Sequence, residues 1–152
     1  NQLIEKDHLR FATSVGFNSK MFEKSGTILL KDFPLNEYAI NHQEAVIIED
    51  VTKDNRYITV KGLENVRSFL LIPLISKGIS IGLITLDHMK PGYFTHRDIE
   101  IGVAIADNAS IAITNARLYQ EALRATERRA GTRHFRAFAL SPSQGRLRTP
   151  RA

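Results

Sequence analysis

The stretch RSFLLIPLISKGISIGLITLD, residues 67–87, decides the fold of this chain. It holds two nearly apolar runs, residues 68–75 and 79–86, on either side of the short polar break Ser76-Lys77-Gly78. Two such runs around a glycine-containing loop predict a β-hairpin. Because each run is apolar on both faces, the hairpin has to be covered above and below. We therefore expect it in the middle of a sheet, with helices or loops on either side.

The two-residue period of a strand assigns the side chains of this hairpin to two faces. In the first run, one face carries Phe69, Leu71 and Pro73, and the other carries Leu70, Ile72 and Leu74. In the second run, strict alternation would place Ile81, Leu83 and Thr85 on one face and Gly82, Ile84 and Leu86 on the other.

Length and composition indicate a single globular domain with a real core. The chain has 152 residues, of which 43% are hydrophobic. No apolar run approaches the ~20 residues of a membrane helix, and no signal peptide opens the chain, so we expect a cytoplasmic location. The sequence contains no cysteine. This excludes disulfides, thiolate nucleophiles, cysteine zinc sites and thioether attachment of a cofactor.

The net charge of +5 comes from the end of the chain. Residues 128–152 hold seven arginines and no acidic residue, which leaves 14 Lys and Arg against 16 Asp and Glu in residues 1–127. Residues 130–152 are rich in Arg, Ser and Pro and read as a basic tail, either non-native or held through Phe135, Phe138 and Leu140. Nucleic-acid binding by this tail is a weaker interpretation than a solvated tail.

The segment between the first strands and the hairpin contains many short elements. Residues 2–5 and 9–14 predict a strand pair, residues 36–43 a short helix with Asn36 as its N-cap, and residues 45–49 a short strand. Residues 19–66 as a whole are typical of a region that shapes a surface or cavity, and an ordinary irregular connection is the equal alternative.

A long helix is predicted from about His96 to about Arg129, where Gly131 ends it. Thr95 and Asp98 have the spacing of a capping box at its start. Its sheet-facing side would carry Ile99, Val103, Ala106, Ser110 and Ile113. A second apolar stripe needs another helix or another subunit and would form a dimer face, with Ile101, Ile105, Ala109, Ala112, Ala116, Tyr119 and Leu123.

The order of these pieces resembles the GAF domain, a sensory fold related to PAS. The resemblance covers about residues 2–123 and rests on EAVIIEDVTKDNRY (44–57), VRSFLLIPLISKGISIGLITLD (66–87), YFTHRDIEI (93–101) and DNASIAITNARLYQEA (107–122). Its most specific parts are Arg67-Ser68, Pro73-Leu74, Ile81-Gly82 and the run of residues 115–119.

The resemblance implies an α+β fold with a six-stranded antiparallel sheet, helices on one face and an irregular helical lid on the other. The usual leading helix is not found and the first strand is short. Residues 19–66 would close a small-molecule pocket, whose floor is the face of Ser68 and Leu70 or the face of Phe69 and Leu71. The implied ligand-binding residues are Phe11, Thr13, Phe33, Tyr38, Ile48, Asp50, Tyr57, Val66, Arg67, Ser68, Leu70 and Leu86.

Catalytic and cofactor signals are sparse. There is no P-loop and no GxGxxG, and the five histidines (8, 42, 88, 96 and 134) lack metal-ligand spacing. Haem binding through His42 or His88 is disfavoured, and no cofactor is expected. Without cysteine, the methionine sulfoxide reductase activity of some GAF proteins and bilin attachment are excluded. Arg56 and Arg67 would either clamp an anionic ligand or pair with Glu49, Asp50 and Asp54.

The resemblance therefore implies a non-catalytic sensory module of a bacterial-type signalling protein. It would bind a small molecule and relay its state through the C-terminal helix to an output domain, such as a histidine kinase or regulator. A homodimer through that helix is expected, with no membrane contact by this segment. The alternative is a dimerisation module without a ligand.

Overall fold

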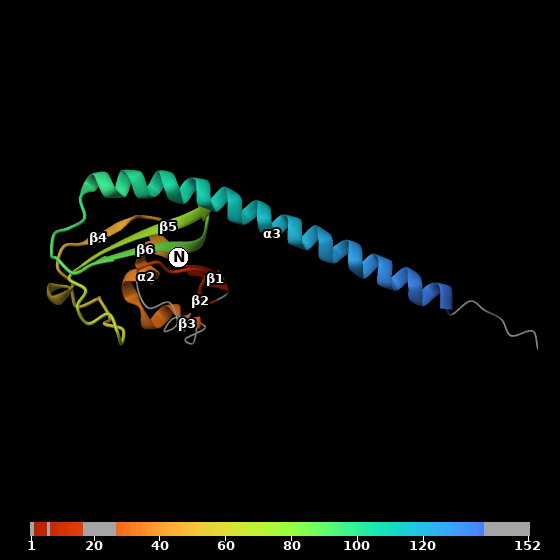
Figure 1. The fold of residues 1–152 in the computed structure, drawn as a ribbon, viewed down its shortest axis with the longest axis horizontal. Coiled ribbons are helices and arrows are strands. Elements are labelled where there is room, and N and C mark those ends of the chain that lie inside the picture. The colour runs from red at the N-terminus through yellow and green to blue at the C-terminus, as the bar shows by residue number, and fades with distance from the viewer. Residues whose placement is uncertain (1, 6, 17–26, 139–152) are drawn as a thin grey trace, which may run out of the picture. The chain divides into compact units, whose positions relative to one another are not determined.

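The computed structural model describes residues 2–5, 7–16 and 27–138, and the side chains of residues 2, 5, 11 and 130–138 are not described. The chain forms two compact units, residues 1–114 and 115–152, and each is treated by itself. The first unit contains the sheet and its covers, and the second contains the later part of a long helix (Figure 1).

The central hairpin is present as predicted. Strand β5 (Ser68–Ser76) pairs with strand β6 (Ile79–His88), from Ser68 opposite His88 to Ser76 opposite Ile79. The two turn residues both have positive φ, +52° at Lys77 and +75° at Gly78. Two consecutive positive φ values are required by the tight hairpin turns that match the right-handed twist of the strands, and glycine adopts them without strain.

Within the described residues the sheet has six strands in the order β3-β2-β1-β6-β5-β4, and every pairing is antiparallel. The remaining strands are β1 (Gln2–Glu5), β2 (His8–Phe11), β3 (Thr27–Leu29) and β4 (Val46–Ile48). The hairpin thus lies in the middle of the sheet, which confirms the prediction from its two apolar faces.

A β-bulge interrupts the alternation that the sequence suggested for β6. Leu74 lies opposite Gly82 and Ile75 opposite Ser80, so Ile81 is the extra residue. Such an extra residue turns the following side chains to the opposite face. As a result Ile81 and Ile84 pack in one core cluster while Leu83 packs in the other, and the strict alternation predicted for this strand was wrong.

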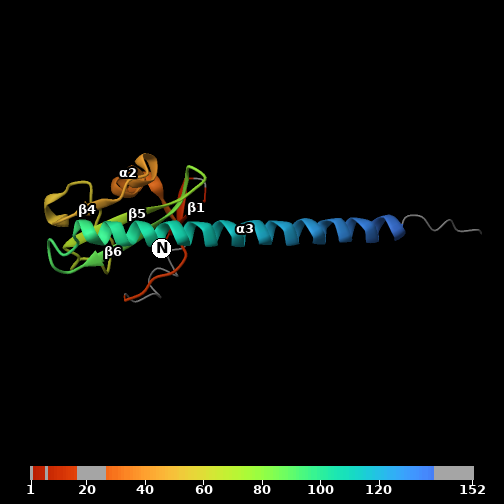
Figure 2. The same cartoon turned by 90° about the horizontal axis from the view of Figure 1, so that it is seen from above.

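The sheet separates two hydrophobic cores. One face carries Leu9, Phe69, Leu71 and Leu83 and is covered by helix α2 (Pro34–His42), the 3-10 turns η1 (Leu30–Asp32) and η2 (Val51–Lys53), and loops. The other face carries Leu70, Ile72 and Leu74 and packs against Ala106 of helix α3 (His96–Phe138). Figures 1 and 2 show the first part of α3 lying along β5 and β6, with α2 on the opposite side.

Helix α2 begins earlier than predicted. Phe33 is its N-cap, Pro34 occupies the first turn, and Asn36 is a buried residue inside the helix, so the prediction of Asn36 as the cap was wrong. Proline suits the first turn because its missing N–H would have no helical partner there. Two hydrogen bonds fasten the helix end to the hairpin: Ser80 Oγ donates to the Ile40 carbonyl at 2.8 Å, and Gln43 Nε2 to the Gly78 carbonyl at 2.7 Å.

The start of α3 carries the predicted capping box. The backbone N–H and the hydroxyl of Thr95 both donate to the Asp98 carboxylate, each at 2.7 Å. Gly102 sits against Ile72, where a Cβ would lie 2.0 Å from the Ile72 Cδ1. Val103 is exposed, which corrects its predicted place on the sheet-facing side, because the buried line runs through Gly102, Ala106 and Ser110.

The second unit continues α3 through residues 115–138, past the predicted stop at Gly131. Tyr119 and Leu123 are 67% and 47% exposed. The side chains of Phe135 and Phe138, and all of Leu140, lie outside the described residues, so their predicted anchoring role is not addressed. In the part of the chain that the structure covers, no helix has the length and apolarity needed to span a membrane.

Candidate functional site

A cavity of about 420 Å³ lies in the first unit, against the lid-side face of the sheet. Its lining comes from six parts of the chain: the loop after β2 (Thr13, Ser14, Val15), β3 (Ile28), the lid (Phe33, Leu35, Asn36, Arg56, Tyr57, Ile58, Val60, Leu63), β5 (Phe69), β6 (Ile84, Thr85, Leu86, Asp87, His88) and the segment before α3 (Tyr93, Phe94). This volume and this mainly apolar wall with a few polar groups are typical of sites for small molecules.

The lid-side wall is built around two aromatic rings. Tyr57 and Phe69 meet edge to face, with ring centroids 5.4 Å apart and planes at 75°. Phe69 reaches the cavity because the alternation of β5 turns it and Leu71 to this face. The floor of the cavity is therefore the face of Phe69 and Leu71, and the alternative face of Ser68 and Leu70 is closed off by α3.

Asp87 places a carboxylate in this apolar surrounding. It lies opposite Phe69 in the β5–β6 register, and its Oδ1 is buried without a hydrogen-bond partner among the residues that the structure describes. Burial raises the pKa of Asp87 from 3.8 to about 6, because the charged form loses its hydration. Burial, with a smaller effect from the Asp87 charge, also raises the pKa of Tyr57 to about 12. A buried acceptor without a donor is costly, so the site favours a ligand group that donates a hydrogen bond.

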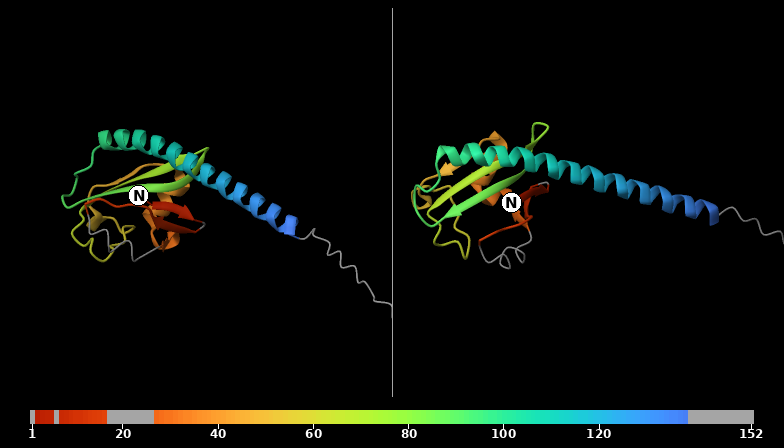
Figure 3. Two further views of the ribbon diagram at one scale, coloured as in Figure 1. Left: turned by 45° about the vertical axis from the view of Figure 1, so that its right-hand side comes forward. Right: turned by 45° about the horizontal axis from the view of Figure 1, so that its top comes forward.

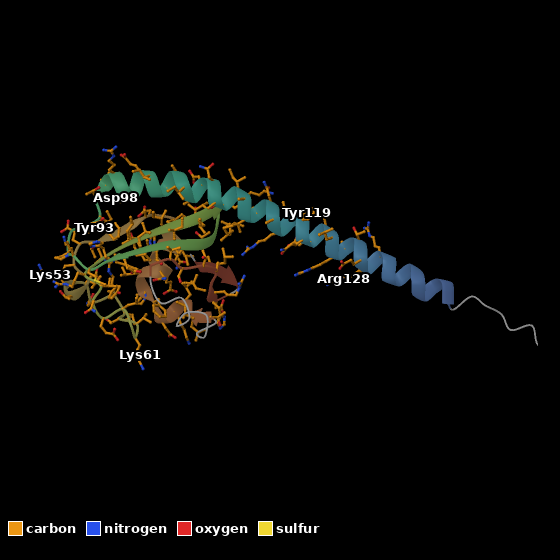
Figure 4. All side chains as sticks on the ribbon, in the orientation of Figure 1. Lys53, Lys61, Tyr93, Asp98, Tyr119 and Arg128 are labelled. Carbon is orange, nitrogen blue, oxygen red and sulfur yellow. The ribbon has the colours of Figure 1, made fainter. Side chains whose placement is uncertain are left out.

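The cavity also reaches residues of the helix side of the sheet. The ring of His88 stacks on Tyr93 with centroids 3.4 Å apart, and Tyr93 meets Phe94 edge to face at 5.4 Å. The His88 Nδ1 accepts a hydrogen bond from the Lys90 N–H at 3.1 Å. Phe94 and Ile99, which lies at the start of α3, both pack against the helix-side core. Figure 4 shows Tyr93 just ahead of the first turn of α3, where Asp98 is labelled.

Both arginines that the sequence offered as an anion clamp pair with acids. Arg67 donates to Asp50 through Nε at 3.3 Å and Nη2 at 3.0 Å. Arg56 donates to Asp54 through Nε at 3.0 Å and Nη2 at 2.7 Å. The hydrogen bonds from Arg67 hold the pKa of Asp50 well below its usual range. Of the two predicted roles, the structure shows the ion pair in each case.

Four of the residues predicted to bind a ligand line this cavity: Thr13, Phe33, Tyr57 and Leu86. Six others lie elsewhere among the residues that the structure describes. Ile48 and Val66 are buried in the lid-side core, and Leu70 is buried in the helix-side core. Ser68 is fully buried on the same face of β5 as Leu70, and Asp50 and Arg67 form the ion pair. Tyr38 is exposed and stacks on His42 at 4.0 Å, and the side chain of Phe11 is not described.

The carboxylate of the cavity, Asp87, was not among the predicted site residues, although a signal for it exists. It directly follows the apolar run of residues 79–86, and the two-residue period of a strand places it on the same face as Leu83 and Thr85. The lid residues Leu35, Val60 and Leu63 had no comparable signal, because they come from short elements and loops without a period.

No group of three or more metal-ligating side chains occurs among the described residues. The two histidines considered as haem ligands have local partners instead. His42 Nδ1 bonds to the Tyr38 carbonyl at 3.0 Å, and His88 stacks on Tyr93. His42 is exposed and does not line the cavity, whereas His88 does.

On the predicted dimer face, Ile101 and Ile105 of the first unit are 52% and 56% exposed, and Ala112 is also exposed. Ala109 is an exception, because it packs against the helix-side core. In the second unit Ala116, Tyr119 and Leu123 are exposed. These placements leave an apolar surface on α3 in each unit.

Comparison with known proteins identifies the family. A sequence model of the GAF domain matches residues 11–113. The GAF domain of a phosphoenolpyruvate-protein phosphotransferase from Coxiella burnetii has a TM-score of 0.70 at 18% identity, covering 79% of this chain and 73% of that one. A GAF domain/HD domain protein from Geobacter sulfurreducens has a TM-score of 0.66 at 15% identity, with 77% and 79% covered.

An enzyme shares the same fold. The free methionine-R-sulfoxide reductase from Neisseria meningitidis, solved in complex with its substrate, has a TM-score of 0.62 at 19% identity, covering 78% of this chain and 67% of that one. At these identities the likeness shows the fold alone. Among proteins with curated descriptions, none matches this sequence.

Proposed function

The chain belongs to the GAF domain family, and on that basis we propose that it is a sensory module that binds a small molecule in the Asp87 cavity. The observation that carries the proposal is the Oδ1 of Asp87, which is buried in a cavity of about 420 Å³ with aromatic walls and has no hydrogen-bond partner within the described part of the chain. GAF domains are signalling modules, and a structural neighbour, a free methionine-R-sulfoxide reductase, has been solved in complex with its substrate.

The side chains around the cavity favour a ligand with an apolar body and a hydrogen-bond donor, such as an ammonium or amide group. The donor would face Asp87, and the body would lie against Phe33, Tyr57 and Phe69. A cationic donor gains further from the faces of aromatic rings. Arg56 also lines the cavity, but its guanidinium is already held by Asp54, which disfavours an anionic ligand.

A relay to α3 is supported by the packing between β6 and the start of that helix. His88 stacks on Tyr93, and Phe94 shares the helix-side core with Ile99. A ligand that displaces Asp87 or His88 would therefore act on the residues that position the first turn of α3. The signal is the difference in ligand affinity between two arrangements of these contacts. Helix α3 would carry it toward an output domain of a larger signalling protein.

We assign no catalysis to this segment. The sequence has no cysteine to act as a redox nucleophile, which separates it from cysteine-dependent reduction of methionine sulfoxide. The family itself leaves an enzymatic role open, since reductases share its fold.

Two measurements test the binding role. Mass spectrometry of the denatured purified protein would identify a co-purified small molecule, and calorimetric titration with that molecule would give its affinity. Asp87→Asn should weaken binding at least tenfold, whereas Asp107→Asn, at an exposed position of α3, should not change it. A protein that carries nothing and shows no thermal shift with a library of small amines and amides would contradict the proposal. Equal affinity of the Asp87→Asn variant would contradict the assigned role of that residue.

The second candidate function is a dimerisation module without a ligand. Its support is the exposure of large apolar side chains on α3, with Ile101 and Ile105 in the first unit and Tyr119 and Leu123 in the second. Sedimentation of the purified chain would decide: Ile105→Glu should split a dimer with the fold intact, while Asn108→Glu serves as the polar control. A strict monomer at high concentration would rule this candidate out.

A further inference from the structure

The turn of the β5–β6 hairpin holds the C-terminal end of α2. Ser80 Oγ donates to the Ile40 carbonyl at 2.8 Å, and Gln43 Nε2 donates to the Gly78 carbonyl at 2.7 Å. Ile40 carries one of the last four carbonyls of α2, which have no partner inside the helix. Gln43, the C-cap, has a φ of +58°, a left-handed conformation that is unfavourable for a residue with a side chain. The turn therefore completes an end of α2 that the helix does not stabilise by itself.

The same turn is bonded to α3 on the other side of the sheet. Thr114 Oγ1 donates to the Oγ of Ser76, the last residue of β5, at 2.9 Å. Ser76 continues the row of Ile72 and Leu74, which lie in the helix-side core. Thr114 is the last residue of the first unit. Figure 3 shows the turn of the hairpin next to α3 from two directions, so one short turn connects two helices on opposite faces of the sheet.

Helix α2 reaches from this turn to the cavity. Its N-cap Phe33 and the first-turn residues Leu35 and Asn36 line the cavity, while its C-terminal end meets the turn. Nine residues of α-helix span about 13 Å, and a packed helix of this length moves as a unit. A ligand that displaces the N-terminal end of α2 would therefore act on the hydrogen bonds at its other end.

The hydrogen bond between Ser76 and Thr114 is the part of the α3 attachment that can open. Both side chains are half-buried, so water can replace either hydroxyl as a partner. By contrast, Gly102 is packed so closely on Ile72 that a Cβ would lie 2.0 Å from the Ile72 Cδ1. Close-packed contacts of this kind do not deform gradually. A displacement of the turn therefore changes the attachment of α3 at Thr114 and leaves the contact at Gly102 in place.

We propose that the turn of the hairpin, residues 76–80, is a junction that couples the lid helix α2 to α3. In one state, which the structure shows, the turn holds both helices. In the other state the end of α2 has moved away from the turn, and water has replaced Thr114 at Ser76. A ligand of the Asp87 cavity that favours one position of α2 would shift this equilibrium. This last step rests on the proposed function, whereas the coupling between the two helices does not.

Amide hydrogen exchange on the full chain, followed by NMR, tests the coupling in both directions. A double variant, Ser80→Ala with Gln43→Ala, removes the bonds between the turn and α2, and Thr114→Val removes the bond to α3 with little change of shape. We expect the double variant to raise the exchange rates of residues 110–114 at least fivefold. Thr114→Val should do the same for residues 40–43, because a coupling between two sites is reciprocal.

Two controls separate this coupling from a general loss of stability. The amide of Leu71, in the buried centre of the sheet, exchanges by global unfolding, so every rate is compared with that of Leu71. Thr126→Val removes the same hydroxyl from α3, but Thr126 Oγ1 donates to the Ala122 carbonyl of its own helix at 3.0 Å. We expect this variant to leave the exchange of residues 40–43 unchanged.

Unchanged exchange of residues 110–114 in the double variant would overturn the inference, and so would an effect in only one direction. An equal effect of Thr126→Val on residues 40–43 would also overturn it, because the lost contact with Ser76 would not be the cause. These measurements use no ligand, so a negative result leaves the proposed binding role to its own test. Conversely, a chain that binds no small molecule would lose the cavity as the input but keep the coupling between α2 and α3.

Discussion

Replacing Asp87 with asparagine should change how the stability of the protein depends on pH. The pKa of Asp87 is raised by burial from 3.8 to about 6 in the folded state. Between these two values the folded state holds the proton and the unfolded state has released it, so folding stability falls as pH rises. Above pH 6 Asp87 is ionised in both the folded and the unfolded state, and the folded state carries the full free-energy cost of burying the charged carboxylate. A shift of roughly two pKa units corresponds to about 3 kcal/mol, as an upper limit.

Urea denaturation followed by circular dichroism at pH 4 to 7.5 would measure this effect. The difference in unfolding free energy, Asp87→Asn minus the parent chain, should increase by up to about 3 kcal/mol between pH 4 and pH 7. Any cost of burying the asparagine amide is the same at every pH, so it does not affect how the difference in unfolding free energy changes with pH. The exposed Asp107→Asn variant should show a flat difference.

A difference for Asp87→Asn that stays constant to within about 0.5 kcal/mol from pH 4 to 7 would refute the reasoning. It would mean that water or a nearby group solvates the carboxylate despite its place in the cavity wall. An increase toward low pH would be a stronger contradiction, because it would require the folded state to favour the charged form.

Three further variants test the fold around the site. Leu71→Ala should lower the unfolding free energy by about 2 to 5 kcal/mol, because Leu71 is fully buried, while Ile79→Ala at an exposed position should change it little. Gly102→Ala should destabilise by about 1 to 2 kcal/mol despite the better helix propensity of alanine, and adding Ile72→Val, which removes the clashing Cδ1, should restore most of the loss in the same denaturation assay. Asp98→Ala removes the acceptor of the capping box and should cost about 0.5 to 2 kcal/mol, and a melting temperature unchanged from the parent chain would contradict it.

The parts of the fold that were predicted correctly are those with a local pattern. The hairpin at residues 67–87 is predicted by two apolar runs and by a turn whose residues accept positive φ. The start of α3 is predicted by the capping box of Thr95 and Asp98. Prediction failed where pairing between segments sets the result. The bulge at Ile81 depends on how β5 pairs with β6. Val103 does not face the sheet as predicted, because Gly102 is the residue of α3 that lies against Ile72 of the sheet.

The candidate site was less predictable, because its walls come from segments distant in sequence. Phe33 and Tyr57 line the cavity, whereas Ile48 and Val66 are packed in the core, and ligand binding by any of these residues stays a prediction. The alternation of β6 could have placed Asp87 on the cavity face. No local pattern shows that its Oδ1 is buried and, among the described residues, without a hydrogen-bond partner. That property depends on what lies across from it in space.

The sequence by itself determined a central two-faced hairpin, a long amphipathic helix, and a site chemistry without cysteine. These follow from periodicity and composition, which act over a few residues. Only the tertiary structure decided which face of the hairpin floors the cavity, which acids hold Arg56 and Arg67, and that the bulge at Ile81 places Leu83 and Ile84 in opposite cores. The physical reason is that burial, ion pairing and strand register are relations between segments, and no single segment carries them.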